Sequence, residues 1–355
     1  MLLTPFYNPD KSYEDNFAEG PFGAFTDGKV YEEKGIPEVS FLGQNVYLPF
    51  GIAAGPLVNG KFVKAAFEKG FDLAVYKTVR SGKYPCHPWP NVLAVHPGGD
   101  LTMERAKEPL VADRNYTEPL GITNSFGVPS FDPSFWQKDM SEAIQNAGRG
   151  KVVIGSFQGT TKGDGNVTSY IEDFVTTAKL VKEAGAKVME ANLSCPNEGS
   201  AHLLCFDLER TKKIAYEIKS AIGNTPLILK LAYFADQEAL ARFVHELGDI
   251  VQGFATINTI AAKIVDDKGE QALPGKGREM SGVCGAPIKW GGIDMVKRLH
   301  KLREESNLEY TIIGVGGVTT PADYQEYHKA GADAVMSVTG AMWNPFLAQE
   351  IKNNH

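Results

Sequence analysis

The chain has 355 residues, of which 43% are hydrophobic and 22% are charged, and its formal net charge is −7. This is an ordinary globular composition with enough apolar surface to build a large core. The net acidity argues against broad nucleic-acid binding, which requires a concentrated basic surface.

The first 45 residues are rich in Phe, Tyr, Gly and Pro and lack helical periodicity. They also lack a basic region followed by a long apolar run, so they do not resemble a targeting sequence. We expect residues 1–45 to form an N-terminal extension, extended in conformation, that packs on a single domain formed by residues 46–355.

Eight short and nearly all-apolar runs follow, which is typical of parallel strands buried on both faces. They span residues 48–54, 71–77, 152–157, 187–193, 227–232, 251–258, 311–317 and 333–339. Between them lie amphipathic segments, several of which end at Gly, the usual residue just past a helix. These segments are 60–70, 135–148, 168–185, 206–222, 236–248, 293–306 and 321–331.

Eight alternations of strand and helix predict an α/β fold, a (β/α)8 TIM barrel, in preference to a doubly wound sheet. Two insertions are long, one after the second strand (about 80–130) and one after the sixth (about 260–286). We expect both to be long loops that carry function.

The four cysteines contain no CxxC pair, so neither a disulfide framework nor a zinc or iron–sulfur site is expected, and no metal site is predicted. No apolar stretch approaches the roughly 20 residues that span a bilayer. These features predict a soluble, cytoplasmic protein that binds neither membrane nor nucleic acid.

Polar residues gather where the predicted strands end, and in such barrels the active site lies at the carboxyl ends of the strands. They are Lys77, Asn192, Cys195, Lys230, Asn258 and Thr259. A lysine at an interior strand end is seldom structural, because an unpaired ammonium there loses solvation without compensation. For either lysine alone, a solvated position on the rim remains the alternative.

Glycines follow the first, seventh and eighth strands in the segments AAG, GVGG and VTG. The last two strands of such barrels commonly hold phosphate, and GVGGVTTPAD offers backbone N–H groups at the start of a helix. Thr339 could add a hydroxyl. The alternative is that Gly316 and Gly317 only permit a tight turn.

Cys195 lies in the segment NLSCPN, between two asparagines and directly before a proline. A core cysteine normally has apolar neighbours, whereas this one is surrounded by amides, a hydroxyl and a turn-forming pair. The segment alone leaves a catalytic thiol and a structural cysteine equally open.

Taken together, these motifs resemble the dihydroorotate dehydrogenases, which are flavoprotein barrels of pyrimidine synthesis. The likeness runs from about residue 48 to the C-terminus, and NLSCPN is its most specific element. It is supported in order by AAG, YKT, NSFGVPS, LILKLA, INT, CGAPI and GVGGV. Cysteine in the motif, Lys77 and NSFGVPS are similar to class 1, whereas class 2 members carry serine and a lysine where this chain has Val58.

The resemblance implies that FMN takes a hydride from C6 of dihydroorotate while a base takes the C5 proton. The implied catalytic residues are Cys195 as the base, Lys77 and Lys230. The implied substrate-binding residues are Lys77, Asn124, Phe126, Gly127, Val128, Asn192, Asn197, Asn258 and Thr259. The implied FMN-binding residues are Ala53, Ala54, Gly55, Lys77, Thr78, Asn192, Lys230, Asn258, Cys284, Gly285, Gly316, Gly317, Val338 and Thr339.

Two other functions remain open. A dihydropyrimidine dehydrogenase-like barrel acting on uracil or thymine shares the SCP loop but typically lacks the asparagine found here as Asn197. A non-catalytic barrel could instead bind a phosphate compound. For the electron acceptor, elimination favours a small soluble molecule such as fumarate, since NAD would need a partner subunit and a membrane quinone an amphipathic element. A homodimer is left open.

Overall fold

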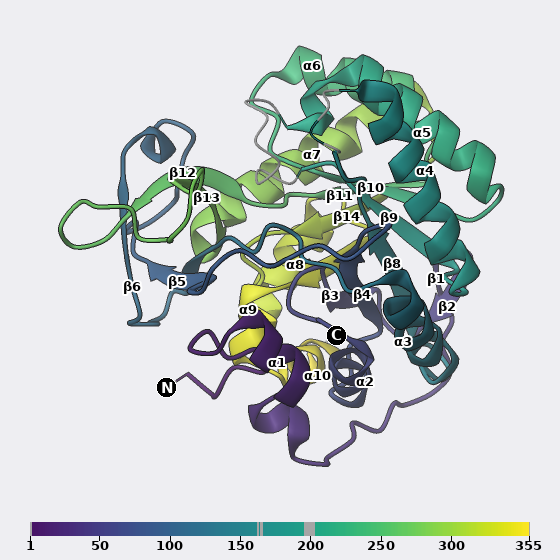
Figure 1. Cartoon of the computed structure of the whole chain (residues 1–355). Helices are drawn as coiled ribbons and strands as arrows, with labels where there is room; N and C mark the ends of the chain where they lie inside the picture. The colour runs from purple at the N-terminus through teal and green to yellow at the C-terminus, as the bar shows by residue number, and fades with distance from the viewer. Residues whose placement is uncertain (1, 162, 164–165, 195–202, 355) are drawn as a thin grey trace.

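The structure, a computed structural model, describes residues 2–161, 163, 166–194 and 203–354, and its centre is a closed barrel of eight parallel strands (Figure 1). The strands follow one another around the barrel in chain order, and the last pairs with the first. They are β3 (Phe50–Ile52), β4 (Leu73–Val79), β8 (Val152–Phe157), β9 (Val188–Asn192), β10 (Leu227–Leu231), β11 (Gly253–Thr256), β14 (Thr311–Val315) and β15 (Ala334–Ser337). Each overlaps one of the eight predicted runs, so the predicted (β/α)8 barrel is confirmed.

Helices surround the barrel and bury one face each against it. They are α2 (Gly60–Glu68), α3 (Pro133–Gln145), α4 (Val167–Glu183), α5 (Leu208–Ile222), α6 (Gln237–Leu247), α7 (Lys289–Ser306) and α8 (Pro321–Lys329), followed by the short α9 (Thr339–Trp343) and α10 (Leu347–Asn353). Side chains that accept backbone N–H groups at the first turn set the start of six of them. These caps are Asn59, Asp132, Asn166, Asp207, Asp236 and Thr320.

The interior of the barrel is apolar towards the amino ends of its strands. Side chains such as Leu73, Val152 and Ile228 fill it in contact with one another. The hairpin formed by β1 (Val39–Phe41) and β2 (Gln44–Val46) adds two further buried residues, Phe41 and Val46, to this cluster. The amino end of the barrel is therefore packed with hydrocarbon, which leaves the carboxyl end to hold polar groups.

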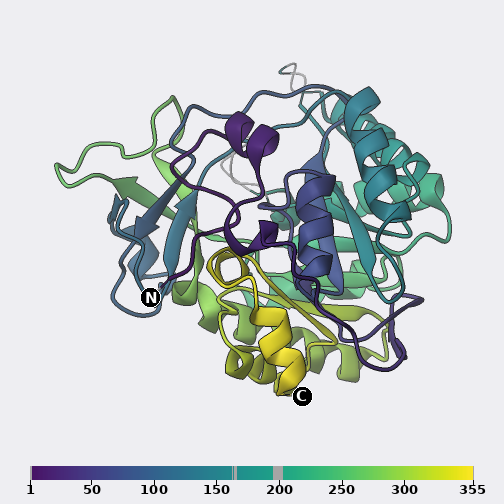
Figure 2. The ribbon, with the colours of Figure 1, turned by 90° about the horizontal axis from the view of Figure 1, so that it is seen from below.

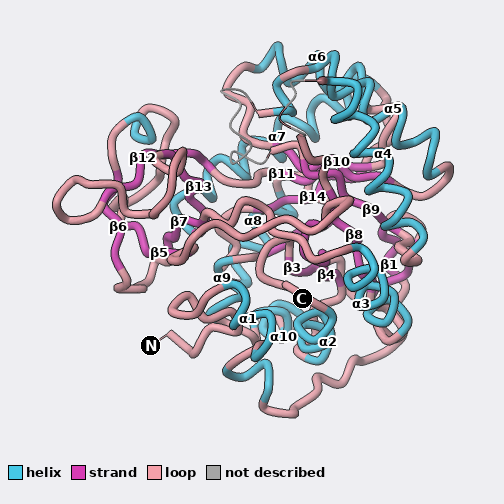
Figure 3. Tube along the Cα trace, viewed as in Figure 1, coloured by secondary structure: helices cyan, strands magenta, loops and turns pink. Residues whose placement is uncertain are grey.

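The two long insertions were expected to be loops, and this expectation is wrong. They form a second closed barrel of five short strands, seen beside the main barrel in Figure 3. Its strands are β5 (Val92–Val95), β6 (Leu110–Asp113), β7 (Gly121–Asn124), β12 (Ile260–Val265) and β13 (Met280–Gly285). The pairing of β7 with β13 joins residues about 160 positions apart, for instance Asn124 with Gly282. Strands of four to six residues with such distant partners give a weak periodic signal in the sequence.

The sequence suggested that the N-terminal segment is extended, but the structure shows that only part of it is. It contains α1 (Tyr13–Glu19) and the 3₁₀ turn η1 (Gly23–Thr26). Ser12 caps α1 by accepting the N–H of Asp15, and the Asn16 side chain bonds back to the carbonyl of Asn8. These local bonds stabilise a helix too short to persist alone. Figure 2 shows the segment passing beside α9 and α10.

The described residues also contain the 3₁₀ turns η2 (Arg105–Lys107), η4 (Leu204–Phe206) and η5 (Ala286–Ile288). Within the described part of the chain, no helix combines the length and apolarity needed to cross a membrane.

Candidate active site

One cavity opens at the carboxyl end of the main barrel, between the two barrels, and its space including the open mouth is about 1250 Å³. Every predicted site residue that the structure describes lines it. These residues are Ala53, Ala54, Gly55, Lys77, Thr78, Asn124, Phe126, Gly127, Val128, Asn192, Lys230, Asn258, Thr259, Cys284, Gly285, Gly316, Gly317, Val338 and Thr339. The remaining two, Cys195 and Asn197, lie outside the described residues.

The two lysines come from different strands and are both buried. Lys77 lies in β4, and its ammonium donates to the carbonyl of Thr78 at 3.2 Å. Lys230 lies in β10, where its backbone is in register with Asn192 of β9. Burial lowers the pKa of Lys230, and the nearby carboxylate of Glu190 opposes that shift. The barrel thus holds two ammonium groups of the cavity lining away from bulk water.

Glu190 also lines the cavity, and the sequence analysis missed it. It precedes Asn192 by two positions in β9, so both side chains leave the strand on the same face. A glutamate at an inward position of an otherwise apolar strand was the available signal. Burial raises the pKa of Glu190, whereas Lys230 and a hydrogen bond from Ser156, at 3.1 Å, act in the opposite direction.

Asparagines from three elements converge on the cavity, and two of them form hydrogen bonds with Ser194. Asn258 donates to the hydroxyl of Ser194 at 3.0 Å and to its carbonyl at 3.2 Å. Asn192 donates to Gln158 at 2.8 Å, and its oxygen accepts from Ser194 at 3.4 Å. The third, Asn124, reaches in from β7 of the small barrel. The residue directly before Cys195 is therefore fixed by two of the predicted substrate-binding amides.

Another part of the cavity wall consists largely of backbone and small residues. Gly285 has φ of +93°, and a Cβ there would lie 2.3 Å from the carbonyl oxygen of Leu120, so only glycine fits. A Cβ at Gly55 would meet no atom within 4 Å. The hydroxyl of Thr339 donates to the thiol of Cys284 at 3.5 Å, and burial raises the pKa of that thiol. This wall offers space and backbone N–H groups to a bound molecule.

Two buried arginines hold the loop that follows β7, and neither was found from the sequence. Arg80 donates to the carbonyls of Val128, at 2.9 Å, and Gly127, at 3.3 Å. Arg278 donates to the carbonyl of Ser125 at 2.8 Å and to its hydroxyl at 3.1 Å. A guanidinium can satisfy several carbonyls at once because its donors are fixed in one plane.

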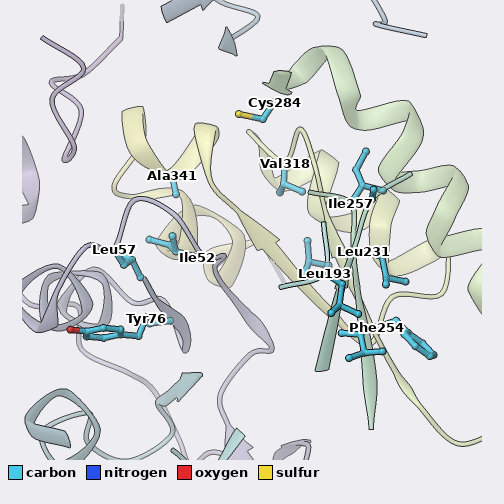
Figure 4. Packing of buried hydrophobic residues seen from close by; sticks show 14 of the residues in the cluster. Ile52, Leu57, Tyr76, Leu193, Leu231, Phe254, Ile257, Cys284, Val318 and Ala341 are labelled. Carbon is cyan, nitrogen blue, oxygen red and sulfur yellow. The ribbon is translucent and has the colours of Figure 1, made fainter. Parts of the chain in front are cut away.

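The other lining residues that the sequence analysis missed are mostly apolar, and they carry no polar signal at a strand end. They are Tyr7, Pro56, Val92, Ile122, Gly282, Ile288, Val315, Val318, Gly340 and Met342. Buried side chains such as Leu57, Leu231 and Ile257 pack in the hydrophobic core at or after the ends of barrel strands (Figure 4). The polar groups of the site therefore stand on a rigid apolar base.

Comparison with known proteins agrees with this geometry. A family model described as dihydroorotate dehydrogenase matches residues 107–354. A dihydroorotate dehydrogenase of Dictyostelium discoideum is 35% identical over 99% of this chain and 97% of its own length. A quinone-type enzyme of Kocuria rhizophila is 28% identical over 88% of this chain and 83% of its own length.

Similarity also extends to a multi-subunit enzyme and to a solved structure. The catalytic subunit of an NAD(+)-type dihydroorotate dehydrogenase B from Brachyspira hyodysenteriae is 26% identical over 66% of this chain and 72% of its own length. The dihydroorotate dehydrogenase of Eimeria tenella in complex with ferulenol superposes with a TM-score of 0.70 and 18% identity, covering 91% of this chain and 85% of that one. The resemblance seen in the motifs is confirmed: the chain belongs to the dihydroorotate dehydrogenase family, whose members oxidise dihydroorotate in pyrimidine biosynthesis.

Proposed function

We propose that this protein oxidises dihydroorotate to orotate with bound FMN and with Cys195 as the base. The observation that carries the proposal is the cavity itself. It brings together two buried lysines, an amide wall of three asparagines from both barrels (Asn124, Asn192 and Asn258) and a glycine wall (Gly55, Gly285, Gly316 and Gly317). Such a combination suits a small anionic substrate placed against a flat cofactor with a phosphate tail.

The glycine wall fits FMN. Its polar end, near Gly285, Gly316 and Thr339, would hold the phosphate through backbone N–H groups and a hydroxyl. Small and apolar residues such as Ala53 and Val338 leave room for the ring system. When bound, FMN supplies a hydride acceptor. Lys230 would stabilise the negative charge that develops on the flavin, because an ammonium held in a buried site interacts strongly with such charge.

The amide wall fits dihydroorotate. Asn124, Asn192 and Asn258 can pair with its ring amides, and Lys77 can pair with its carboxylate. Cys195 would remove the proton from C5 as the C6 hydride leaves with its electron pair, so that the C5–C6 double bond forms. The hydrogen bonds around Ser194 support this role, because they fix the residue next to the base.

For the second half of the reaction we propose a small soluble acceptor, with fumarate as the first candidate. The ammonium of Lys77 and the amides that hold the carboxylate of dihydroorotate can hold another carboxylate after orotate leaves. Among the curated relatives, some are named for NAD(+) and some for quinone, so the acceptor needs its own test.

A comparison of two substrates tests the reaction. Protein loaded with FMN is assayed with dihydroorotate and, separately, with dihydrouracil, which lacks the carboxylate. We expect turnover to be much faster with dihydroorotate, because Lys77 and the amides have a carboxylate to bind. Faster turnover of dihydrouracil would favour the dihydropyrimidine dehydrogenase-like alternative, and no flavin uptake would favour a non-catalytic barrel.

The acceptor is tested by steady-state turnover of dihydroorotate with fumarate, NAD and a soluble quinone in turn. We expect fumarate to support turnover. Brisk turnover with the quinone and none with fumarate would contradict the proposed acceptor and leave the oxidation of dihydroorotate standing.

A further inference from the structure

Tyr7 belongs to the N-terminal segment, more than 40 residues before the first barrel strand, yet its side chain lines the active-site cavity. The residue is only 2% exposed. Within the described residues, its hydroxyl has no hydrogen-bond partner. Buried hydroxyls are normally hydrogen-bonded, so this one calls for a partner that the described residues do not supply.

The segment around Tyr7 is fixed on both sides. The N–H of Phe6 donates to the carbonyl of Met342 in α9 at 3.0 Å, and the ring of Phe6 stacks on Phe25 with centroids 4.2 Å apart. On the other side, the N–H of Asn8 donates to the Asn16 side chain at 2.7 Å. The ring of Tyr7 meets Phe126 edge to face at 5.8 Å. The hydroxyl is thus held in its buried position, and the ring cannot readily turn outwards.

The burial of Tyr7 decides whether its hydroxyl keeps its proton. Burial raises the pKa of Tyr7 well above its ordinary value, so the phenol keeps its proton and can donate. The adjacent residue, Phe6, bonds to Met342 of α9, and α9 also carries Thr339, which lies at the proposed phosphate end of the cavity. A flavin offers acceptors in the carbonyl oxygens of its pyrimidine ring and in its ring nitrogens, and FMN adds the hydroxyls and phosphate of its tail.

We infer that Tyr7 is a cofactor-binding residue, which donates a hydrogen bond from the N-terminal segment to the flavin in the cavity. The inference rests on the proposed function, since it requires FMN in that cavity. It makes Tyr7 part of the active site, although the family model matches only residues 107–354.

The substitution Tyr7→Phe tests this, because it keeps the ring and removes only the hydroxyl. The dissociation constant of FMN is measured by fluorescence titration of the apoprotein, and the melting temperature of the apoprotein is measured alongside. We expect the dissociation constant to rise about threefold to tenfold, as for the loss of one neutral hydrogen bond. The melting temperature of the apoprotein should stay the same or rise, because an unpaired buried hydroxyl has been removed.

Tyr13→Phe is the matched control. Tyr13 is a buried tyrosine of the same segment and faces the same Phe126 ring, at 6.3 Å, but it is not a lining residue of the cavity. Its FMN dissociation constant should equal that of the wild type. An unchanged FMN dissociation constant in Tyr7→Phe, or an equal rise in Tyr13→Phe, would overturn the inference about Tyr7 but not the proposed function. A wild-type protein that takes up no FMN would overturn the proposed function as well.

Discussion

Lys230 and Glu190 are opposite charges buried together inside the main barrel, and each changes the ionisation of the other. Burial alone lowers the pKa of Lys230 and raises that of Glu190, because it disfavours the charged form of each group. The carboxylate of Glu190 works against the first shift by favouring the ammonium. Glu190 therefore tunes the pH range over which Lys230 is charged.

We predict that Glu190→Gln shifts the alkaline limb of the pH profile to lower pH. Without the carboxylate, the pKa of Lys230 falls further below its ordinary value, so the ammonium loses its proton earlier as the pH rises. The measurement is the rate of flavin reduction by dihydroorotate as a function of pH. Glu172→Gln, at an exposed position of α4, should leave the profile unchanged. An alkaline limb that does not move in Glu190→Gln would contradict this role.

The residues that the sequence could predict are those at strand ends and in motifs. Lys77, Asn192 and Asn258 were found because polar groups interrupt apolar runs at the point where a barrel keeps its active site. Tyr7 was missed because an aromatic residue in an irregular segment has no periodic partner. Its place in the cavity depends on tertiary packing against α9 and Phe126.

Among the elements, the loop after β7 depends on an arginine from the other insertion. Besides its bonds to Ser125, Arg278 donates to the carbonyls of Pro88, at 2.8 Å, and Pro90, at 3.2 Å. The buried side chain of Arg278 thus links the two insertions, both of which contribute residues to the cavity. Asn124, which directly precedes Ser125, is held in place through this link.

Arg278→Met should raise the Michaelis constant for dihydroorotate about tenfold or more, because Asn124 loses its support and several buried carbonyls lose their donor. Hydrogen exchange should also accelerate in residues 88–92 and 124–128. Arg105→Met, at an exposed arginine of the first insertion, serves as the control and should change neither. If Arg278→Met keeps the hydrogen-exchange rates and the Michaelis constant of the wild type, the loop after β7 does not depend on Arg278.

The barrel strands and the helices α2 to α8 could be predicted because apolar runs and amphipathic segments alternate along the chain and six of these helices begin at a capping side chain. The small barrel could not. The strand β6 has only four residues, and its partners β5 and β12 lie before it and far after it in the chain. Strands of this kind form because their partners are placed by the rest of the fold.

Across the whole molecule, both ends of the chain are tied to the base of the barrel by one buried ionic cluster. Lys352 of α10 bonds to Asp72 at 2.7 Å and to Glu33 of the N-terminal segment at 2.7 Å. Lys151 also bonds to Asp72, at 2.6 Å, and to Glu33. The N–H of Leu48 donates to the second oxygen of Asp72 at 2.6 Å. The cluster links segments about 320 residues apart.

We predict that Lys352→Met lowers the free energy of unfolding by about 3 kcal/mol, because it leaves buried carboxylates with one partner fewer. The side chain of Lys352 is only 9% exposed. The control is Lys64→Met, which breaks an ion pair with Glu68 whose lysine is 69% exposed. That change should cost less than about 0.5 kcal/mol. Equal effects in urea unfolding would mean that the cluster adds nothing beyond a surface pair.

The central claim is that dihydroorotate is oxidised in the cavity by a thiol base and a flavin. It is tested most directly by mixing FMN-loaded protein with dihydroorotate without oxygen and following the loss of flavin absorbance. The wild type should bleach rapidly, Cys195→Ala about 10² to 10⁴ times more slowly, and Cys205→Ala, which removes another thiol, at nearly the wild-type rate. Absence of bleaching in the wild type, or an undiminished rate in Cys195→Ala, would contradict the account.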